Sequence, residues 1–462
     1  MKREELGFEE GRQVHFGLLA LVLVLLLSGL VMLFSASMAR GLVRESDTTH
    51  YIARQIVFSA AGLFAIALLT RFPARRLNRA ALAAGSYVLV TLLLLLVLSP
   101  LGITANQHRR WLPLLPGMTF QPSELAKIVL VFAAAVYYER LAAWRRTEDY
   151  GCRRLRRRER DDRGRERIRR VRVKLSPGGR LWRDFAYDIL LPAAALGIWL
   201  VLIALQSHVS AMLILCLLLV SVMLGADIRP RSWLLGGALA LVLGSLLVLL
   251  LWLNRDSLQA LAANGGLVGK IAQRLGIFLG LPGVTGDDVY QSEQALIAIG
   301  SGGFWGIGLG RSAQKTNYLP EAHNDYIYSI ICEELGFVGG AAIVLLFFVF
   351  MLLGFQIAGR QRRRFERVLA VGYTSLICIQ ATLSIAVNLR LVAPTGVSLP
   401  FFSYGGTANF FFLIAVAMLL NTSKFGVPLP RHEGTGDARA PAAARRSGRP
   451  GAASGNPGEA AS

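Results

Sequence analysis

The chain has 462 residues, of which 54% are hydrophobic, and it carries a formal net charge of +21 and a mean hydropathy of +0.48. A soluble protein of this length would intersperse its apolar residues with charges, whereas here they form unbroken runs of about 20, the length that crosses a bilayer as a helix. The composition therefore excludes a soluble globular protein and favours an integral membrane protein.

Ten apolar runs of this kind follow one another along the chain. The first, HFGLLALVLVLLLSGLVMLFSAS, is too long for the core of a signal peptide, so we expect it to be retained as a membrane span. Each run is predicted to be a helix, because the backbone amides of a spanning segment must be satisfied within the segment. The sequence thus predicts an all-α integral membrane protein with about ten transmembrane helices, at roughly 15–37, 51–70, 81–99, 123–142, 187–206, 209–226, 232–253, 326–353, 367–391 and 400–421.

The positive charge is concentrated in three connections between these runs. Seventeen Lys and Arg lie between Arg145 and Arg183, and two shorter clusters, RFPARRLNR and RQRRRFER, cover 71–79 and 360–367. All three lie on one side of the membrane if the chain starts inside, so the positive-inside rule places both termini in the cytoplasm. RNA binding by the 145–174 stretch is the alternative, but the distribution favours contact with anionic lipid and no nucleic-acid partner.

The chain is predicted to divide into a transmembrane domain over 1–421 and a disordered cytoplasmic tail over 422–462, rich in Ala, Gly, Pro and Arg. Within the domain, 143–186 is a basic cytoplasmic loop, and 254–325 is a large outer loop between the seventh and eighth spans. This outer loop contains SLQALAANGGLVGKIAQRLGIFLG, whose apolar spacing favours a helix along the membrane surface. The four cysteines lie mostly in apolar runs and indicate core residues or free thiols.

The motif QPSELAK, residues 121–127, opens the fourth predicted span. It places Glu124 and Lys127 three residues apart on one helical face, where charges at the edge of a bilayer are costly unless they are paired or face a cavity. One interpretation is a helix cap at Ser123 with local pairing of Glu124 and Lys127. The other is a functional pair that faces a substrate.

Polar residues are densest in LPEAHNDYIYSIICEELGFVGG, residues 319–340, at the predicted outer start of the eighth span. The segment carries Glu321, His323, Asp325, Glu333 and Glu334. A helix cap would explain one of these residues, and a single histidine among carboxylates is a weak signal for zinc, so no metal site is predicted. APTGVSLPFFSYGGTANF, residues 393–410, interrupts the last span with Pro and Gly, a conformation tolerated at membrane depth only against protein or a watery cavity.

Taken in order, NQHRRW, QPSELAK, QSEQALIAIGSGGFWGIGLG, LPEAHNDYIYSIICEELG and PTGVSLPFFSYGG resemble the motifs of the SEDS family of bacterial cell-wall proteins, RodA and FtsW. The resemblance runs from the first span to Asn421, leaving out the cytoplasmic loop, and EAH in the LPEAHND motif leans toward the FtsW branch. It implies a SEDS-type bundle in the bacterial cytoplasmic (inner) membrane. It also implies an inverting peptidoglycan glycosyltransferase that uses lipid II as donor and acceptor, serves cell division or cell shape, and works with a class B penicillin-binding protein.

The chemistry implied by this resemblance needs a carboxylate base for the attacking sugar hydroxyl and cations for the departing pyrophosphate. The candidate catalytic residues are Asp287 and Asp288, in the outer-loop stretch GVTGDDVYQ. The candidate substrate-binding residues are Arg109, Arg110, Glu124, Lys127, Gln291, Lys315, Glu321, His323, Asp325 and Ser403. A divalent cation could assist departure of the pyrophosphate, but no set of metal ligands demands one.

The sequence departs from the family pattern at these two aspartates. In the family a pattern like D-P-x-G-x-G-Y-Q places an aspartate six residues before the tyrosine, whereas Val284 holds that position relative to Tyr290. Asp287 and Asp288 lie three and two residues before Tyr290, and a shift of three residues moves a carboxylate by up to roughly 10 Å in an extended chain. The pair is either a re-routed catalytic site, with Asp287 favoured, or ordinary turn chemistry beside Gly286.

A second departure is QSHVS, residues 206–210, which lacks the Pro and Asp of the family's Q-P-D-x-G-like sequence but offers His208 as a polar group. Three functions stay open at this point: a polymerase, a transporter of lipid-linked precursor, and a non-catalytic scaffold for the penicillin-binding protein. A transporter predicts charges near the bilayer midplane, whereas the polar residues lie at the outer ends of the spans. The missing Asp-Pro is the best support for the scaffold.

Overall fold

A computed structural model describes residues 14–105, 108–115, 118–147, 150, 152–160, 166–253, 287–315, 319 and 322–424. Within this part of the chain, seven helical segments are long and apolar enough to cross a membrane: α1 (Phe16–Glu45), α2 (His50–Leu69), α3 (Ala80–Leu98), the continuous α5, η4 and α6 (Pro177–Leu205), α12 (Ile327–Gly359), α13 (Arg364–Asn388) and α14 (Gly406–Ser423). Three further helices, α4 (Pro122–Arg145), α7 (Val209–Gly225) and α8 (Pro230–Leu253), coincide with the remaining predicted runs. The predicted multi-pass helical fold is confirmed.

Two helix boundaries differ from those predicted within the glycine- and proline-containing motifs, and outside these motifs α1 extends to Glu45, beyond 37, while the fifth span begins at Pro177, before 187. The last span begins at Gly406 and not at 400, because Phe401 has a φ of 69°, which a right-handed helix cannot accommodate. The eighth span extends to Gly359 and is interrupted at Gly336, whose φ is 68°. The departures at Phe401 and Gly336 lie in the two motifs whose glycines and prolines set the local backbone.

The connections contain strands that the sequence analysis did not predict. At one end of the bundle, β1 (Ile103–Ala105), β2 (His108–Leu115) and β3 (Met118–Phe120) form an antiparallel sheet in that order. Within the basic loop, β4 (Cys152–Arg160) and β5 (Glu166–Lys174) pair as an antiparallel hairpin. A short helix, η2 (Ala74–Leu77), follows α2, and α11 (Asp287–Ser301) lies within the predicted outer loop. The predicted surface helix over 257–280 and the tail after 424 lie outside the described residues.

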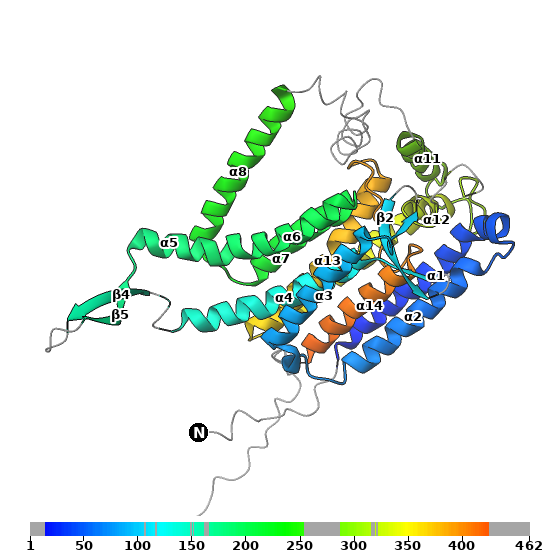
Figure 1. Ribbon diagram of the computed structural model, residues 1–462. Coiled ribbons are helices and arrows are strands. Elements are labelled where there is room, and N and C mark those ends of the chain that lie inside the picture. The colour runs from blue at the N-terminus through cyan, green and yellow to red at the C-terminus, as the bar shows by residue number, and fades with distance from the viewer. Residues whose placement is uncertain are drawn as a thin grey trace, which may run out of the picture. The chain divides into compact units, whose positions relative to one another are not determined.

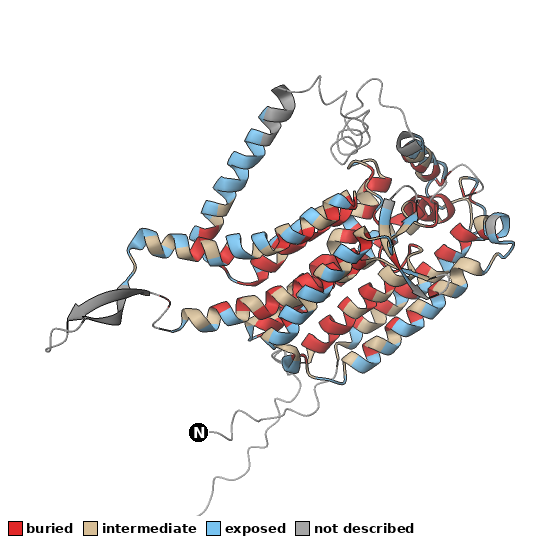
Figure 2. Cartoon of the chain, viewed as in Figure 1, coloured by how far each residue is buried: buried red, intermediate tan, exposed pale blue. Residues whose placement is uncertain are grey.

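The bundle is built around α13 and α14 (Figure 1). Helix α13 packs against α4, α7, α12 and α14, while α14 also packs against α2, and α1 packs against α2 and α12. In α13 and α14, 67% of the most apolar stretch is buried, compared with 22% in α2 and α3. Figure 2 shows the same division, with buried residues gathered on the central helices and more exposed residues on the outer helices.

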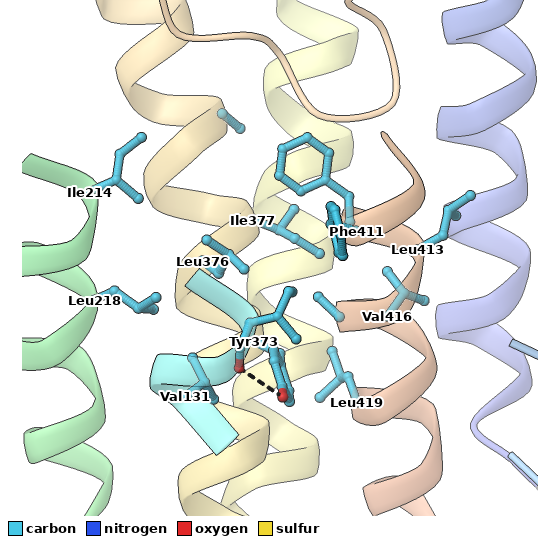
Figure 3. Packing of buried hydrophobic residues seen from close by; sticks show 14 of the residues in the cluster. Val131, Ile214, Leu218, Tyr373, Leu376, Ile377, Phe411, Leu413, Val416 and Leu419 are labelled. Atoms are coloured by element: carbon cyan, nitrogen blue, oxygen red, sulfur yellow. Dashed lines mark hydrogen bonds between the residues drawn. The ribbon is translucent and has the colours of Figure 1, made fainter. Parts of the chain in front are cut away.

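The core at the centre of the bundle is apolar and closely packed. Figure 3 shows side chains of α4, α7, α13 and α14 meeting there, among them Val131, Leu218, Leu376 and Val416. The buried Tyr373 hydroxyl lies in this region and donates a hydrogen bond to the Ile128 carbonyl oxygen at 3.3 Å. Because lipid is as apolar as these side chains, close packing and internal hydrogen bonds hold such helices together.

Candidate functional site

A cavity of about 670 Å3 lies at the end of the bundle that carries β2 and the start of α4, within the size range of small-molecule sites. Its walls come from α2, α4, α7, α11, α13, the strands β2 and β3, and the segments that precede α12 and α14. The charged residues that line it are Arg54, Arg110, Glu124, Lys127 and Asp325. Motifs that lie far apart in the sequence therefore meet around one space.

The pair formed by Glu124 and Lys127 lies in the first turns of α4 and lines this cavity. The Lys127 Nζ donates to Glu124 Oε1 at 2.7 Å and to Gln380 Oε1 at 2.9 Å, and the Lys127 side chain is only 2% exposed. The expected local pairing is confirmed, but the expected cap at Ser123 is wrong. The cap position belongs to Gln121, and Pro122 takes the first helical position, where its missing N–H costs nothing.

Ser123 instead contacts His208, at the turn between α6 (Leu191–Leu205) and α7. The His208 Nδ1 lies 3.3 Å from Ser123 Oγ and 3.3 Å from Gln121 Nε2. The Arg110 guanidinium on β2 donates to the Gln206 carbonyl oxygen at 3.4 Å and also to the Ser207 carbonyl oxygen. The QSHVS segment thus joins the sheet to α4, and His208 lines the cavity as a buried, hydrogen-bonded residue.

Asp325 lies at the cavity wall just before α12, opposite the segment that leads to α14. The Asn388 amide nitrogen donates to the Asp325 carbonyl oxygen at 2.8 Å, and the Asn388 Oδ1 accepts from the Ser329 amide at 3.0 Å. At Gly396, where φ is 62°, a Cβ would lie 3.1 Å from Asp325 Oδ2. The backbone of the PTGVSL motif therefore approaches the Asp325 carboxylate directly, which explains a glycine at this position.

His323 and Ser403 are not among the described residues that line the cavity. The buried His323 ring packs against Tyr51 and Tyr404, with ring centroids 4.9 Å and 5.8 Å away. The Ser403 hydroxyl accepts the Leu399 amide at 2.7 Å and so shapes the turn before α14. Burial raises the pKa of the Tyr404 hydroxyl, an effect that the neighbouring Arg54 opposes, so Tyr404 presents a neutral hydroxyl to the cavity.

Glu333 and Glu334 hold a glycine-rich loop and do not line the cavity. The Glu333 carboxylate accepts the Ala313 amide at 3.0 Å and the Ser312 hydroxyl, while Glu334 Oε1 lies 2.7 Å from Lys315 Nζ. The Ser35 hydroxyl of α1 also donates to Glu334, at 2.7 Å. Glu333 and Glu334 of LPEAHNDYIYSIICEELG and the candidate Lys315 therefore form an internal clamp between α1, α12 and residues 302–315.

The glycines of QSEQALIAIGSGGFWGIGLG lie where the loop over 302–315 packs against α12. The Ile307 amide donates to the Glu333 carbonyl oxygen at 3.0 Å, and the Phe337 amide donates to the Gly303 carbonyl oxygen at 2.9 Å. At Gly336 a Cβ would lie 2.3 Å from the Gly306 nitrogen, so two stretches of backbone touch where α12 is interrupted. The glycines permit close backbone approach within the fold.

The remaining candidates have different positions. Arg109 is exposed on β2 and donates to the Ser99 carbonyl oxygen at 3.4 Å, outside the set of described cavity residues. Glu321 lies outside the described residues. Among the residues that the structure does describe, no group of three or more His, Cys, Asp or Glu could hold a metal ion.

Asp287 and Asp288 are the first two residues of α11, and the structure does not describe their side chains. Gln291 follows on the same helix and lines the cavity. Positions 287 and 288 lie four and three residues before Gln291, which places them on the same helical face. Acidic residues in the first turn of a helix are also favoured by its dipole, so a purely structural role is the alternative.

The sequence analysis missed several residues that line the cavity. Arg54 is a charge within a predicted span, a signal that by itself marks a functional candidate in a membrane protein. Gln380 is a polar residue within the ninth apolar run, and its amide connects Lys127 to Ser398 through contacts of 2.9 Å and 3.4 Å. Both residues belong to apolar runs and lie outside the motifs quoted above.

Comparison with known proteins gives consistent matches over nearly the whole chain. A family model described as "Cell cycle protein", which covers FtsW, RodA and SpoVE, matches residues 16–426. The probable peptidoglycan glycosyltransferase FtsW of Nitrosomonas europaea is 31% identical over 414 residues, which cover 87% of this chain and 91% of that protein. The probable peptidoglycan glycosyltransferase FtsW of Nitrosococcus halophilus is 33% identical over 411 residues, with coverage of 87% and 90%.

Two solved structures share the fold. One belongs to a study of the structural coordination of polymerization and crosslinking by a peptidoglycan synthase complex, and it superposes with a TM-score of 0.65 at 24% identity, covering 89% of this chain and 97% of the other. The rod shape determining protein RodA of Thermus thermophilus superposes with a TM-score of 0.56 at 24% identity, with coverage of 89% and 96%.

Proposed function

Because this chain belongs to the family of FtsW, RodA and SpoVE, we propose that it is a peptidoglycan glycosyltransferase that polymerises lipid II into glycan strands. The observation that carries the proposal is the cavity in which the buried pair of Glu124 and Lys127 meets Arg110 and Asp325. A carboxylate and several cations around one space suit a reaction that moves one proton and releases one pyrophosphate.

The reaction forms a bond between a sugar hydroxyl oxygen and the anomeric carbon of a second lipid-linked sugar. The bond between that carbon and the pyrophosphate oxygen breaks, the hydroxyl proton passes to a carboxylate, and the lipid pyrophosphate departs as an anion. We assign the base to Asp287 or Asp288, which begin the helix that brings Gln291 to the cavity. Glu124 is a weaker candidate base, because its carboxylate is already engaged by the Lys127 ammonium at 2.7 Å.

We assign binding of the pyrophosphate to the cations of the cavity. Arg54 and Arg110 line the cavity from α2 and β2, and Lys127 lines it from α4. Guanidinium groups match the geometry of phosphate oxygens and keep their charge at all relevant pH values. The Lys127 ammonium is already held by Glu124 and Gln380, so we expect it to orient the site and the two arginines to contact the phosphates.

The arrangement of charge along the bundle supports an outward-facing cavity. Arg54 lines the cavity near the start of α2, whereas the basic segment 71–79 follows the far end of the same helix, about 24 Å away at a rise of 1.5 Å per residue. The hairpin β4–β5 and the basic segment 360–367 also follow the ends of α4 and α12 that point away from the cavity. The positive-inside rule then assigns the cavity to the outer face and both termini to the cytoplasm.

We further propose that a class B penicillin-binding protein is the partner that crosslinks the product. The test is to purify the chain with its cognate penicillin-binding protein, supply labelled lipid II, and measure polymer for wild type and for Asp287→Ala/Asp288→Ala. Polymer from wild type and none from the double variant is the expected result. Glu293→Ala, an exposed acid on the same helix α11, is the matched control and should retain activity.

The outcomes of this experiment separate the alternatives. If the wild-type protein makes no polymer with any partner, the proposed enzyme activity is contradicted and the role of a non-catalytic scaffold is favoured. Unchanged polymer from the double aspartate variant would move the base to Asp325 or Glu124.

A further inference from the structure

A second cavity, of about 380 Å3, lies where α2 ends and α14 ends. Its wall includes Arg71, Phe72 and Arg76 from the connection after α2, together with Asn421 and Lys424 from the end of α14. Arg54 lines the first cavity near the other end of α2, so the two cavities lie at opposite ends of that helix. This position corresponds to the membrane interface, because the apolar stretches of α2 and α14 stop at Leu69 and Ser423.

The backbone that forms this cavity is held in place by Asn421, a residue that is 2% exposed. The Asn421 amide nitrogen donates to the carbonyl oxygens of Leu69 and Phe72, each at 2.6 Å, and its Oδ1 accepts the Ala74 amide at 3.1 Å. The Lys424 Nζ donates to the Thr70 carbonyl oxygen at 2.6 Å. Side chains of α14 therefore hold the turn after α2 in place, and the same hydrogen bonds define the shape of the cavity.

The arginines of the segment 71–79 divide into two kinds. The Arg75 Nε lies 2.6 Å from Glu366 Oε1 on α13, so this arginine joins two parts of the bundle. Arg71 and Arg76 are exposed and line the cavity with Lys424, and the described residues around the cavity include no carboxylate. Three cations around one space without an acid repel one another, and an anion would relieve that repulsion.

An apolar surface accompanies these cations. Phe72 lines the same cavity and is 55% exposed, at the level where the apolar part of α2 ends. A ligand with a phosphate beside an apolar tail would contact both features, the phosphate on the guanidinium groups and the tail on the phenyl ring. Anionic phospholipid meets this description, and it is present at the interface where the cavity lies.

We propose that this cavity binds the headgroup phosphate of an anionic phospholipid. Arg71 and Arg76 contact the phosphate oxygens, Lys424 adds charge from the end of α14, and the acyl chains lie along Phe72 and the lipid-facing side of α2. The bound lipid joins the end of α2 to the end of α14, the helix that forms part of the first cavity at its other end. This inference does not depend on the polymerase activity proposed above.

The test measures lipid retained by the purified full-length protein. Wild type and Arg71→Gln/Arg76→Gln are equilibrated with an equal mixture of phosphatidylglycerol and phosphatidylcholine, and bound lipid is counted by native mass spectrometry. We expect wild type to retain phosphatidylglycerol selectively, and the double variant to retain about tenfold less, as the loss of charge-assisted hydrogen bonds predicts. The charge-matched control is Arg79→Gln/Arg362→Gln, two exposed arginines outside the cavity, which should behave as wild type.

Inorganic phosphate distinguishes a lipid site from a site for a free anion. Added phosphate should leave the retained phosphatidylglycerol unchanged, because it lacks the apolar part that contacts Phe72. Displacement of the lipid by phosphate would overturn the lipid assignment. Equal retention of phosphatidylglycerol by wild type and Arg71→Gln/Arg76→Gln, with both proteins eluting as folded monodisperse species, would overturn the site itself.

Discussion

Two buried lysine–glutamate pairs lie close to the starts of two spanning helices, and their surroundings differ. The Lys127 Nζ lies 2.7 Å from a Glu124 oxygen, and the Lys315 Nζ lies 2.7 Å from Glu334 Oε1. The first pair lines the large cavity, together with Gln380. The second pair is enclosed by Ser35 and the loop over 302–315, outside the described cavity lining.

Distance and burial therefore do not separate a pair that faces a substrate from a pair that holds the fold. All four side chains are less than 10% exposed, and both lysines make two or more polar contacts. What separates them is access to the cavity, since a side chain acts on a ligand only where the ligand can reach it. Variants that affect stability at one pair and activity at the other would test this distinction.

The largest effect on stability is expected at the enclosed pair. Lys315→Met removes the cation and leaves the Glu334 carboxylate buried, at a cost of about 3–5 kcal/mol. The thermal unfolding midpoint of the purified protein should fall accordingly. In Lys315→Met/Glu334→Leu, where both charges are replaced by apolar groups, most of the stability should return; a double variant as unstable as the single one would contradict a purely structural pair.

The largest effect on activity is expected at the pair that lines the cavity. Lys127→Met should lower the rate of lipid II polymerisation by about 100- to 1,000-fold, because Glu124 and Gln380 lose the ammonium that orients them and the cavity loses one of its cations. Its unfolding midpoint should fall less than that of Lys315→Met, since cavity water can reach Glu124. Replacing both charges should not restore activity here, so Lys127→Met/Glu124→Leu should stay inactive. Restored polymerisation in this double variant would contradict a functional role for the pair.

The smallest effect is expected at Ser35, which donates to Glu334 from α1. Ser35→Ala removes the hydrogen bond to Glu334 and the one that Ser35 accepts from Lys315 Nζ, but it leaves the ion pair between Lys315 and Glu334 intact, so stability should fall by about 1–2 kcal/mol. Polymerisation measured well below the unfolding midpoint should match wild type. A large loss of polymerisation with an unchanged midpoint would show that this clamp also serves the reaction.

The membrane class and the order of the spans could be predicted from the sequence alone. Both follow from local properties: an apolar run of about 20 residues must form a helix in lipid, wherever its neighbours lie. The pairing of Glu124 with Lys127 was also predictable, because residues three apart on a helix are neighbours. The strands β1 and β3 escaped prediction, since three residues leave little alternation to detect, and the eight-residue β2 escaped it because Pro113 within the strand and Pro116 after it favour a loop.

Which polar residues act together depends on how the helices pack in the folded bundle. Lys127 reaches Gln380, which is 253 residues away in the sequence, because α4 packs against α13. The acids of LPEAHNDYIYSIICEELG also have different neighbours in the fold. Asp325 lines the cavity, whereas Glu333 and Glu334 contact the loop over 302–315. A sequence records how far apart residues lie along one helix, whereas the lateral order of helices in lipid depends on how their surfaces pack, which no single segment encodes.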